Sequence, residues 1–252
     1  MIRKLGNWIL VLLLGVSACS SDGGFNAGTA AVVGMGLLAA GTIDEDDVKE
    51  MSAAAAKELD AKFTVADSNS DYAQRLERLT RDMRRYNGMN LNFKVYLSPE
   101  INAFAMADGT VRVFSGLLDA MPDDQVYAVI GHEVGHVALE HSYEQMRKQI
   151  LTSTAFEAAA SAGGTLGELT ASQLGALAHQ AINARFSQED ELEADRFAVN
   201  MLHKQGKDPR AMLRSIETLE KKAGGGGGSF LSTHPSTARR KAELQEAINK
   251  LK

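Results

Sequence analysis

Two histidines and a glutamate, in the run His132-Glu133-Val134-Gly135-His136, are the residues whose types and spacing most clearly predict chemistry. Side chains four residues apart lie on one face of a helix, so both imidazoles can bind one metal ion. Zinc accepts neutral imidazole, and a catalytic zinc keeps one of its four positions for water. Glu133 would act as general base on that water. The run predicts hydrolysis with one Zn²⁺ per chain; two surface histidines on a solvated helix are the alternative.

A third protein ligand is required, and its type separates the classes of zinc peptidase. Leu139 and Ser142 stand where a metzincin would have Gly and His, which excludes that class. His141 is out of register for a ligand, and we expect it on the surface or behind the ligands. The remaining candidates are the acidic residues of segment 187–196.

Helical spacing divides those acidic residues between two faces. One face is polar throughout and is predicted to be solvated: Glu189, Glu193, Arg196, Asn200 and His203. The other becomes apolar and must face the core: Glu191, Asp195, Ala198, Val199 and Leu202. An inward carboxylate is costly unless it is paired or bound to metal. We therefore predict Glu191 as the third ligand and Asp195 as the carboxylate that orients a ligand histidine, with an ordinary acidic surface helix as the alternative.

The elements that must position these groups predict an α+β fold that is mainly helical. The run Pro122-Asp123-Asp124 begins the helix that carries the two histidines. Segment 103–114 is predicted to be a hairpin that turns at Asp108-Gly109. Alternation also predicts a strand whose apolar side chains face one way: Phe93, Val95 and Leu97. We expect this small sheet to pack beside the histidine helix.

Capping signals and apolar periodicity predict the remaining helices. A helix from Asp71 is expected to end near Asn87-Gly88, and two helices are expected within 152–184. Capping-box patterns begin a helix at Thr42-Ile43-Asp44-Glu45 and another at Thr170-Ala171-Ser172-Gln173. The last helices are predicted at about 187–204, about 209–222 and after residue 235.

The N-terminal residues predict export and a lipid anchor. Arg3 and Lys4 precede an apolar run, 8–16, that is too short to span a bilayer comfortably. The run Val16-Ser17-Ala18-Cys19 resembles a bacterial lipobox, in which the cysteine thiol is acylated and the leader is removed. Ser20 after the cysteine favours the outer membrane, by resemblance to such lipoproteins. An ordinary secretory signal or a short signal anchor is the alternative.

These signals divide the chain into three parts. We predict a lipoprotein signal peptide at 1–18, a Gly/Ala-rich tether at 19–41 and the folded domain at 42–252. The single cysteine excludes an intramolecular disulfide. A net charge of -5 and a pI near 5.7 provide no basic field for phosphates, so we expect no nucleic-acid partner.

Several motifs together resemble the HtpX-like and CAAX-prenyl-protease-like zinc peptidases. They are the HExxH run, the helix of Glu191 and Asp195, and a late His234-Pro235 followed by Arg240. The similarity covers essentially the whole chain, including the leader and segments 102–107 and 186–188. The resemblance implies a gluzincin-type metallopeptidase domain with zinc held by His132, His136 and Glu191 and with Glu133 as base.

The resemblance also implies a role for His234, because the matching histidine of the family sits near the metal. His234 would either stabilise the oxyanion or fill the open zinc position and keep the enzyme latent, and the glycine run 224–228 would let its loop swing. A surface histidine at a helix start is the alternative. For Arg240, contact with substrate and a structural ion pair are both open.

The activity that the resemblance implies is endoproteolysis of misfolded or misassembled proteins. The multi-pass members have transmembrane helices that this sequence lacks, so cell-envelope proteins are the expected substrates. Edge-strand pairing would hold an extended, unfolded polypeptide along Asn102, Ala103, Phe104 and Ala105; a plain structural strand is the alternative. A periplasmic chaperone or assembly factor for outer-membrane proteins that uses the same groove is the competing function. A structural zinc protein would need no Glu133 and would usually use Cys.

Overall fold

The computed structural model describes residues 43–152, 170–223 and 230–251. The predicted signal peptide and tether, with Cys19, lie outside the described residues, as do the glycine run 224–228 and most of the earlier helix expected within 152–184. The elements, in chain order, are α2 (Glu45–Lys62), α3 (Asp71–Thr80), the 3₁₀ turn η1 (Arg81–Met83), β1 (Arg85–Tyr86), β2 (Met89–Asn90), β3 (Asn92–Tyr96), β4 (Ala103–Ala105), β5 (Thr110–Phe114), α4 (Ser115–Ala120), α5 (Asp123–Ala138), α6 (His141–Thr152), α8 (Ala171–Ile182), α9 (Gln188–Lys204), α10 (Arg210–Ala223), α11 (Phe230–Thr233) and α12 (Ala238–Lys250).

A three-stranded sheet in the order β3-β5-β4 lies at the centre of the fold. The predicted β4–β5 hairpin is confirmed: the two strands are antiparallel, and Gly109 takes the left-handed backbone of the turn with φ 86°. β3 runs parallel to β5, so two strands of opposite direction flank β5. This arrangement leaves β4 at one edge of the sheet.

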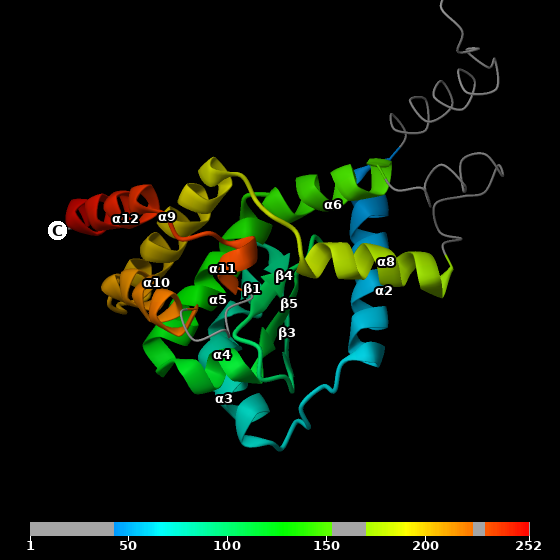
Figure 1. The fold of residues 1–252 in the computed structure, drawn as a ribbon, viewed down its shortest axis with the longest axis horizontal. Helices are drawn as coiled ribbons and strands as arrows, with labels where there is room; N and C mark the ends of the chain where they lie inside the picture. The colour runs from blue at the N-terminus through cyan, green and yellow to red at the C-terminus, as the bar shows by residue number, and fades with distance from the viewer. Residues whose placement is uncertain (1–42, 153–169, 224–229, 252) are drawn as a thin grey trace, which may run out of the picture.

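Helices cover both faces of the sheet (Figure 1). α2, with α6 and α8, packs on one face, where Tyr96, Phe104 and Phe114 lie in its apolar core. α5 and α3 pack against the other face, where Val95 and Val113 point into the core, and α9, α10 and α12 lie on the far side of α5. The α+β, mainly helical fold class predicted from the sequence is therefore confirmed.

The burial of both faces corrects the prediction for β3. Phe93 and Val95 are at least partly buried, but Leu97 follows the strand and is 44% exposed. Tyr96, on the opposite side of the strand from Val95, is fully buried and stacks on Phe63 of the segment after α2. Simple alternation fails because a strand covered on both sides has no solvent face.

Two predicted helix ends were also wrong. α2 begins two residues later than predicted, because Asp44 and not Thr42 is the N-cap and forms a capping box with Asp47. That start places three acidic residues in the first turn, where the helix dipole favours negative charge. Asn87 and Gly88 both have positive φ and form the two-residue turn between β1 and β2, so α3 ends earlier, at Thr80.

The second capping-box prediction is confirmed, and α9 begins where a helix was expected. Thr170 and Gln173 form the capping box of α8. α9 begins after Ser187, which forms a capping box with Asp190. In the described part of the chain, no helix combines the length and the hydropathy that crossing a membrane requires.

Candidate metal centre

The two predicted ligand histidines lie in the middle of α5, and the core encloses them. α5 is buried continuously from Val126 to His136, and His132, Glu133 and His136 are each at most 1% exposed. The alternative of a solvated helix is therefore wrong.

Small residues bring α5 and α9 close together. A Cβ atom on Gly135 would lie 3.1 Å from the backbone Cα of Ala194, and one on Gly131 would lie 2.4 Å from the terminal methyl of Met201. Glycine at both positions lets the two helices approach at nearly backbone distance. The carboxylates of α9 consequently reach the histidines of α5, although about sixty residues of chain separate them.

α9 divides into the two faces predicted from its sequence. Glu191 and Asp195 are 2% and 1% exposed, whereas Glu189 and Glu193 are exposed. The acidic-surface-helix alternative therefore holds only for the outer face.

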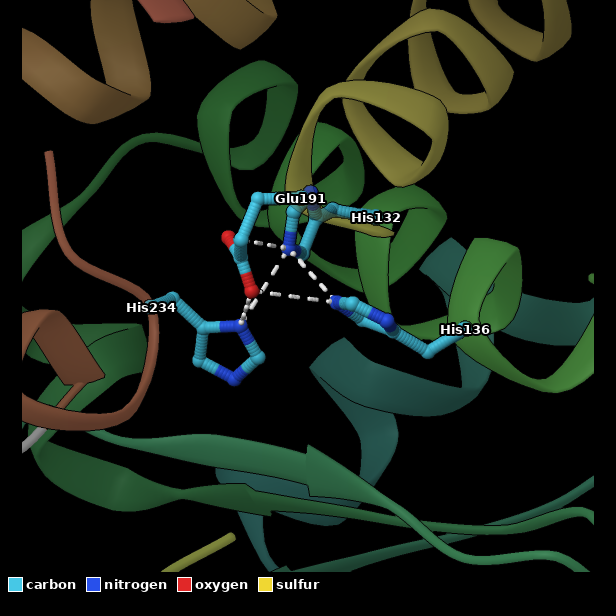
Figure 2. A group of neighbouring side chains, drawn as sticks. All are labelled: His132, His136, Glu191 and His234. Carbon is cyan, nitrogen blue, oxygen red and sulfur yellow. Dashed lines mark hydrogen bonds and ion pairs between the residues drawn. The ribbon is translucent and has the colours of Figure 1, made fainter. Parts of the chain in front are cut away.

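Four side chains converge on one point from α5, from α9 and from the loop between α11 and α12 (Figure 2). They are His132, His136, Glu191 and His234, whose ligand atoms all lie within 4.8 Å of one another. His132 Nε2 lies 3.1 Å from His136 Nε2 and 3.4 Å from His234 Nδ1. The Glu191 carboxylate oxygens lie 3.5 Å from Nε2 of both His132 and His136. Tetrahedral zinc at about 2.0 to 2.1 Å from each ligand sets its ligands about 3.3 Å apart, which matches this spacing.

Hydrogen bonding indicates that the group fits a cation. His132 Nδ1 lies 2.9 Å from Asp195 Oδ1, so a neutral His132 carries its hydrogen there and presents a lone pair at Nε2. This lone pair faces His136 Nε2 and the Glu191 carboxylate, so acceptors meet without donors between them. Glu133 Oε1 is buried and has no hydrogen-bond partner. Converging acceptors of this kind are stable when a metal ion lies between them.

The electrostatics of the site also favour a cation. Burial lowers the pKa of His132, but the carboxylates of Asp195 and Glu191 outweigh burial and raise this pKa to about 9. The same negative potential attracts a metal ion. Burial lowers the pKa of His136 well below its usual value, which leaves a neutral imidazole that can bind metal. Burial raises the pKa of Glu133, which suits a group that must take up a proton during reaction.

Arg240 holds the Asp195 carboxylate. The sequence had left two roles open for Arg240, contact with substrate and a structural ion pair. Arg240 Nε and Nη2 donate to the Asp195 carboxylate at 2.8 and 2.7 Å, and Nη1 lies 2.6 Å from Glu191 Oε2. Arg240 is 3% exposed. Burial would raise the pKa of Asp195, but its bonds to Arg240 and His132 keep it below the usual value. The geometry corresponds to a structural ion pair.

His234 is buried beside the predicted ligands, so the surface-histidine alternative is wrong. Its ring stacks on Phe230 with centroids 4.5 Å apart. Nδ1 lies 2.8 Å from Glu191 Oε1, and Nε2 lies 3.5 Å from Glu133 Oε1. His234 thus occupies the fourth corner of the ligand group.

Phe186 was missed as a site residue in the sequence, and the place of His141 had been left open. Phe186 stacks on His136 with centroids 3.8 Å apart and an interplanar angle of 18°; segment 186–188 had been noted only as part of the family resemblance. His141 begins α6 and lies behind His136, with their Nδ1 atoms 3.1 Å apart. The structure therefore supports the expectation that His141 lies behind the ligands, and not the one that places it on the surface.

The predicted substrate strand is β4, the edge strand. Phe104 points into the core, whereas antiparallel pairing turns the backbone groups of Ala103 and Ala105 away from β5. Asn102 precedes the strand, is 2% exposed and accepts the N–H of Ala103 at its side-chain oxygen. Ser142 donates to the Ala105 carbonyl at 3.2 Å, so the outward Ala103 N–H and Ala105 carbonyl both already have side-chain partners.

A pair of histidines one turn apart on one helix, with a glutamate from a second helix, defines a gluzincin-type metallopeptidase. Residues 68–248 match the family model described as Peptidase family M48, and the chain belongs to this family. It is a metalloendopeptidase.

Curated relatives agree with this assignment. Metalloprotease LoiP of Escherichia coli (strain K12) is 40% identical over 222 residues, which cover 85% of this chain and 88% of that protein. Metalloprotease YcaL of the same organism is 35% identical over 248 residues, 96% of this chain and 98% of that protein. The beta-barrel assembly-enhancing protease of that strain is 30% identical over 178 residues, which cover 66% of this chain but 36% of that protein.

Proposed function

We propose that the chain is a zinc-dependent endopeptidase that cleaves misfolded or misassembled cell-envelope proteins. The observation that carries this proposal is the buried group of His132, His136 and Glu191, with a Glu133 carboxylate oxygen beside it that accepts no hydrogen bond. Two imidazoles and one carboxylate are a common ligand set of catalytic zinc in hydrolases. One zinc ion per chain fits this group.

The residues of the chain divide the chemistry between them. Zinc, when bound, supplies a Lewis acid that polarises the peptide carbonyl and acidifies water. Glu133 takes the proton of that water and returns it to the leaving nitrogen, and its raised pKa favours this exchange. Asp195 and Arg240 hold His132 in one orientation, so the lone pair on Nε2 points into the site.

The edge of β4 supplies a way to hold the substrate. Ala103 and Ala105 direct their backbone groups outward, and an extended polypeptide can pair with them regardless of its side chains. Asn102 would have to release the Ala103 N–H, and Ser142 the Ala105 carbonyl, when a substrate pairs there. This mode suits unfolded polypeptides, because a folded protein seldom offers a free extended segment.

His234 is proposed to keep the enzyme latent. Its Nδ1 lies among the ligand atoms, at the position that water or substrate needs during catalysis. A histidine that stabilised the oxyanion would direct an N–H at the substrate from outside the ligand group. Movement of the loop between α11 and α12 would open the fourth position.

The proposed location is the outer membrane, facing the periplasm, with lipid on Cys19. The lipobox resemblance and the residue after the cysteine support this location. A relative that is named for β-barrel assembly supports envelope proteins as the substrate class.

The test compares the wild-type chain with Glu133→Gln. Purified protein is assayed for bound metal and for cleavage of unfolded casein, with and without chelator. We expect about one zinc per chain in both proteins, and we expect cleavage only by the wild type without chelator. Glu217→Gln is the matched control, because this exposed glutamate on α10 lies outside the site.

The outcome also separates the protease from the competing chaperone. If Glu133→Gln retains full biological activity and binds unfolded clients, holding rather than cleaving is the function. Wild-type protein that contains no metal would refute the proposed enzyme mechanism.

A further inference from the structure

The two histidines of α5 differ in the groups behind their rings. His132 Nδ1 faces the carboxylate of Asp195 at 2.9 Å, and Arg240 fixes that carboxylate. His136 Nδ1 instead faces another imidazole, at 3.1 Å from Nδ1 of His141. One ligand is thus oriented by an anion and the other by a second histidine.

Metal binding determines which nitrogen donates in this histidine pair. A neutral His136 that binds metal through Nε2 carries its hydrogen on Nδ1, so it donates and His141 Nδ1 accepts. A neutral His141 then carries its own hydrogen on Nε2. That nitrogen lies 3.3 Å from Glu193 Oε2 and 3.8 Å from Asp190 Oδ1.

We propose that His141 is a positioning residue for the metal ligand His136 and that Glu193 orients His141 in turn. The inference rests on the proposed function, since it requires His136 to bind zinc. It assigns a role to a histidine outside the HExxH run and to a glutamate on the outer face of α9. An acceptor behind a ligand histidine fixes its tautomer and raises its basicity.

The backbone between α5 and α6 places His141 for this role. α5 ends at Ala138 and α6 begins at His141, and Glu140 between them has left-handed backbone with φ 63°. The chain reverses within these few residues, so a side chain five positions after His136 turns back onto it. His141 is 9% exposed, and the two ring centroids are 5.2 Å apart.

The contribution of each contact to zinc affinity should decrease from the buried ligands outward to the exposed carboxylates. Asp195 is buried, whereas the side chains of Asp190 and Glu193 are 35% and 51% exposed. Exposed charged partners contribute little, so the hydrogen bond between His136 and His141 should matter most. Loss of Glu193 should have only a small effect.

The experiment measures zinc affinity of the purified full chain by competition with a chelating indicator. His141→Phe keeps a ring of similar size and removes both nitrogens, and we expect about 10- to 100-fold weaker binding. His141→Asn places a side-chain oxygen near the position of Nδ1, so affinity should stay within about threefold of wild type. His203→Asn, at an exposed position on α9, is the matched control and should not change affinity.

A second measurement detects the tautomers directly. In ¹⁵N NMR of the zinc-loaded wild type, we expect hydrogen on Nδ1 of His136 and on Nε2 of His141. If His141 had only a structural role, His141→Phe would shift the unfolding midpoint measured in chelator and leave zinc affinity unchanged. If His141→Phe fails to fold, the Asn variant and the wild-type spectrum still decide.

Three results would overturn the inference: wild-type affinity in His141→Phe, affinity in His141→Asn as weak as in the Phe variant, or hydrogen on Nδ1 of His141. These results are distinguishable from failure of the proposed function. A wild type that binds no zinc contradicts the enzyme, whereas a wild type that binds and cleaves while His141→Phe behaves identically contradicts only the role of His141.

Discussion

Two clusters of charged side chains are largely buried in this protein, and they differ in how completely their hydrogen bonds are made. The Asp60 cluster joins α2 to the sheet: Asp60 accepts from Arg112 at 2.8 and 3.0 Å, from Lys94 at 2.7 Å and from the Tyr96 hydroxyl at 2.8 Å. Arg112 is 2% exposed, and its remaining nitrogen donates to Asn92 and Val111.

The candidate metal cluster, formed by His132, His136, Glu191, Asp195 and Arg240, is built differently. Asp195 and Arg240 are paired as fully as Asp60 and Arg112. The inner atoms, however, are acceptors that face one another, and Glu133 Oε1 beside them has no hydrogen-bond partner. Burial and charge are common to both clusters, so unmet hydrogen-bonding capacity is what indicates a ligand site.

The largest expected effect is that of Glu191→Gln. The substitution keeps the shape of the side chain and removes the anionic ligand, so we expect zinc affinity to fall at least about 100-fold and casein cleavage to be lost. Metal content and turnover are the measurements. The contrast drawn between the two clusters is wrong if this variant binds zinc and cleaves like the wild type.

Asp60→Asn should have the opposite profile. Arg112 would remain buried without its anion, so the free energy of unfolding should fall by about 2 to 4 kcal/mol, measured in urea. Metal content and cleavage by the folded protein should not change. The double variant Asp60→Asn with Arg112→Met should recover part of the lost stability, and a further loss would mean that the pair is not the cause.

His234→Ala tests whether one member of the ligand group is dispensable. If His234 fills the position that substrate needs, its removal should raise turnover of unfolded casein by about tenfold while zinc stays bound. Lower turnover with bound zinc would assign the oxyanion role instead. Unchanged turnover would remove both roles.

The smallest expected effect is a pH dependence of stability. Burial raises the pKa of Asp60, but its bonds to Arg112, Lys94 and Tyr96 outweigh burial and lower it below the unfolded value. A lowered folded-state pKa stabilises the protein above the unfolded pKa of about 3.9, and this stability is lost as pH falls through the folded pKa. The free energy of unfolding should therefore drop below about pH 5 by about 1 kcal/mol more in wild type than in Asp60→Asn. Equal slopes of the free energy of unfolding against pH in the two proteins would contradict this prediction.

Local signals in the sequence predicted the elements that carry the candidate metal cluster. HExxH lies within one helix, and the two faces of α9 follow from helical spacing alone, so Glu191 and Asp195 could be selected without knowledge of the fold. The turn at Asp108-Gly109 likewise specifies the β4–β5 hairpin. Each of these inferences depends on residues within a few turns of one another.

Contacts between distant segments could not be predicted in this way. β3 pairs in parallel with β5, which no turn between them encodes. Arg112 in the middle of a strand suggests a solvent-facing side chain until its partner, 52 residues earlier, is known. Asn87-Gly88 is compatible with a helix end as well as with a hairpin turn, and only the pairing of β1 with β2 decides between them.

The close approach of α5 and α9 has a consequence for how stable this domain can become. Glycine within a helix lowers its intrinsic propensity by about 1 kcal/mol relative to alanine, so replacing such glycines ordinarily stabilises a protein. At position 135 an added methyl group would meet backbone, which cannot rotate away. The substitution would push Glu191 away from the histidines, so improving the helix would weaken the metal site.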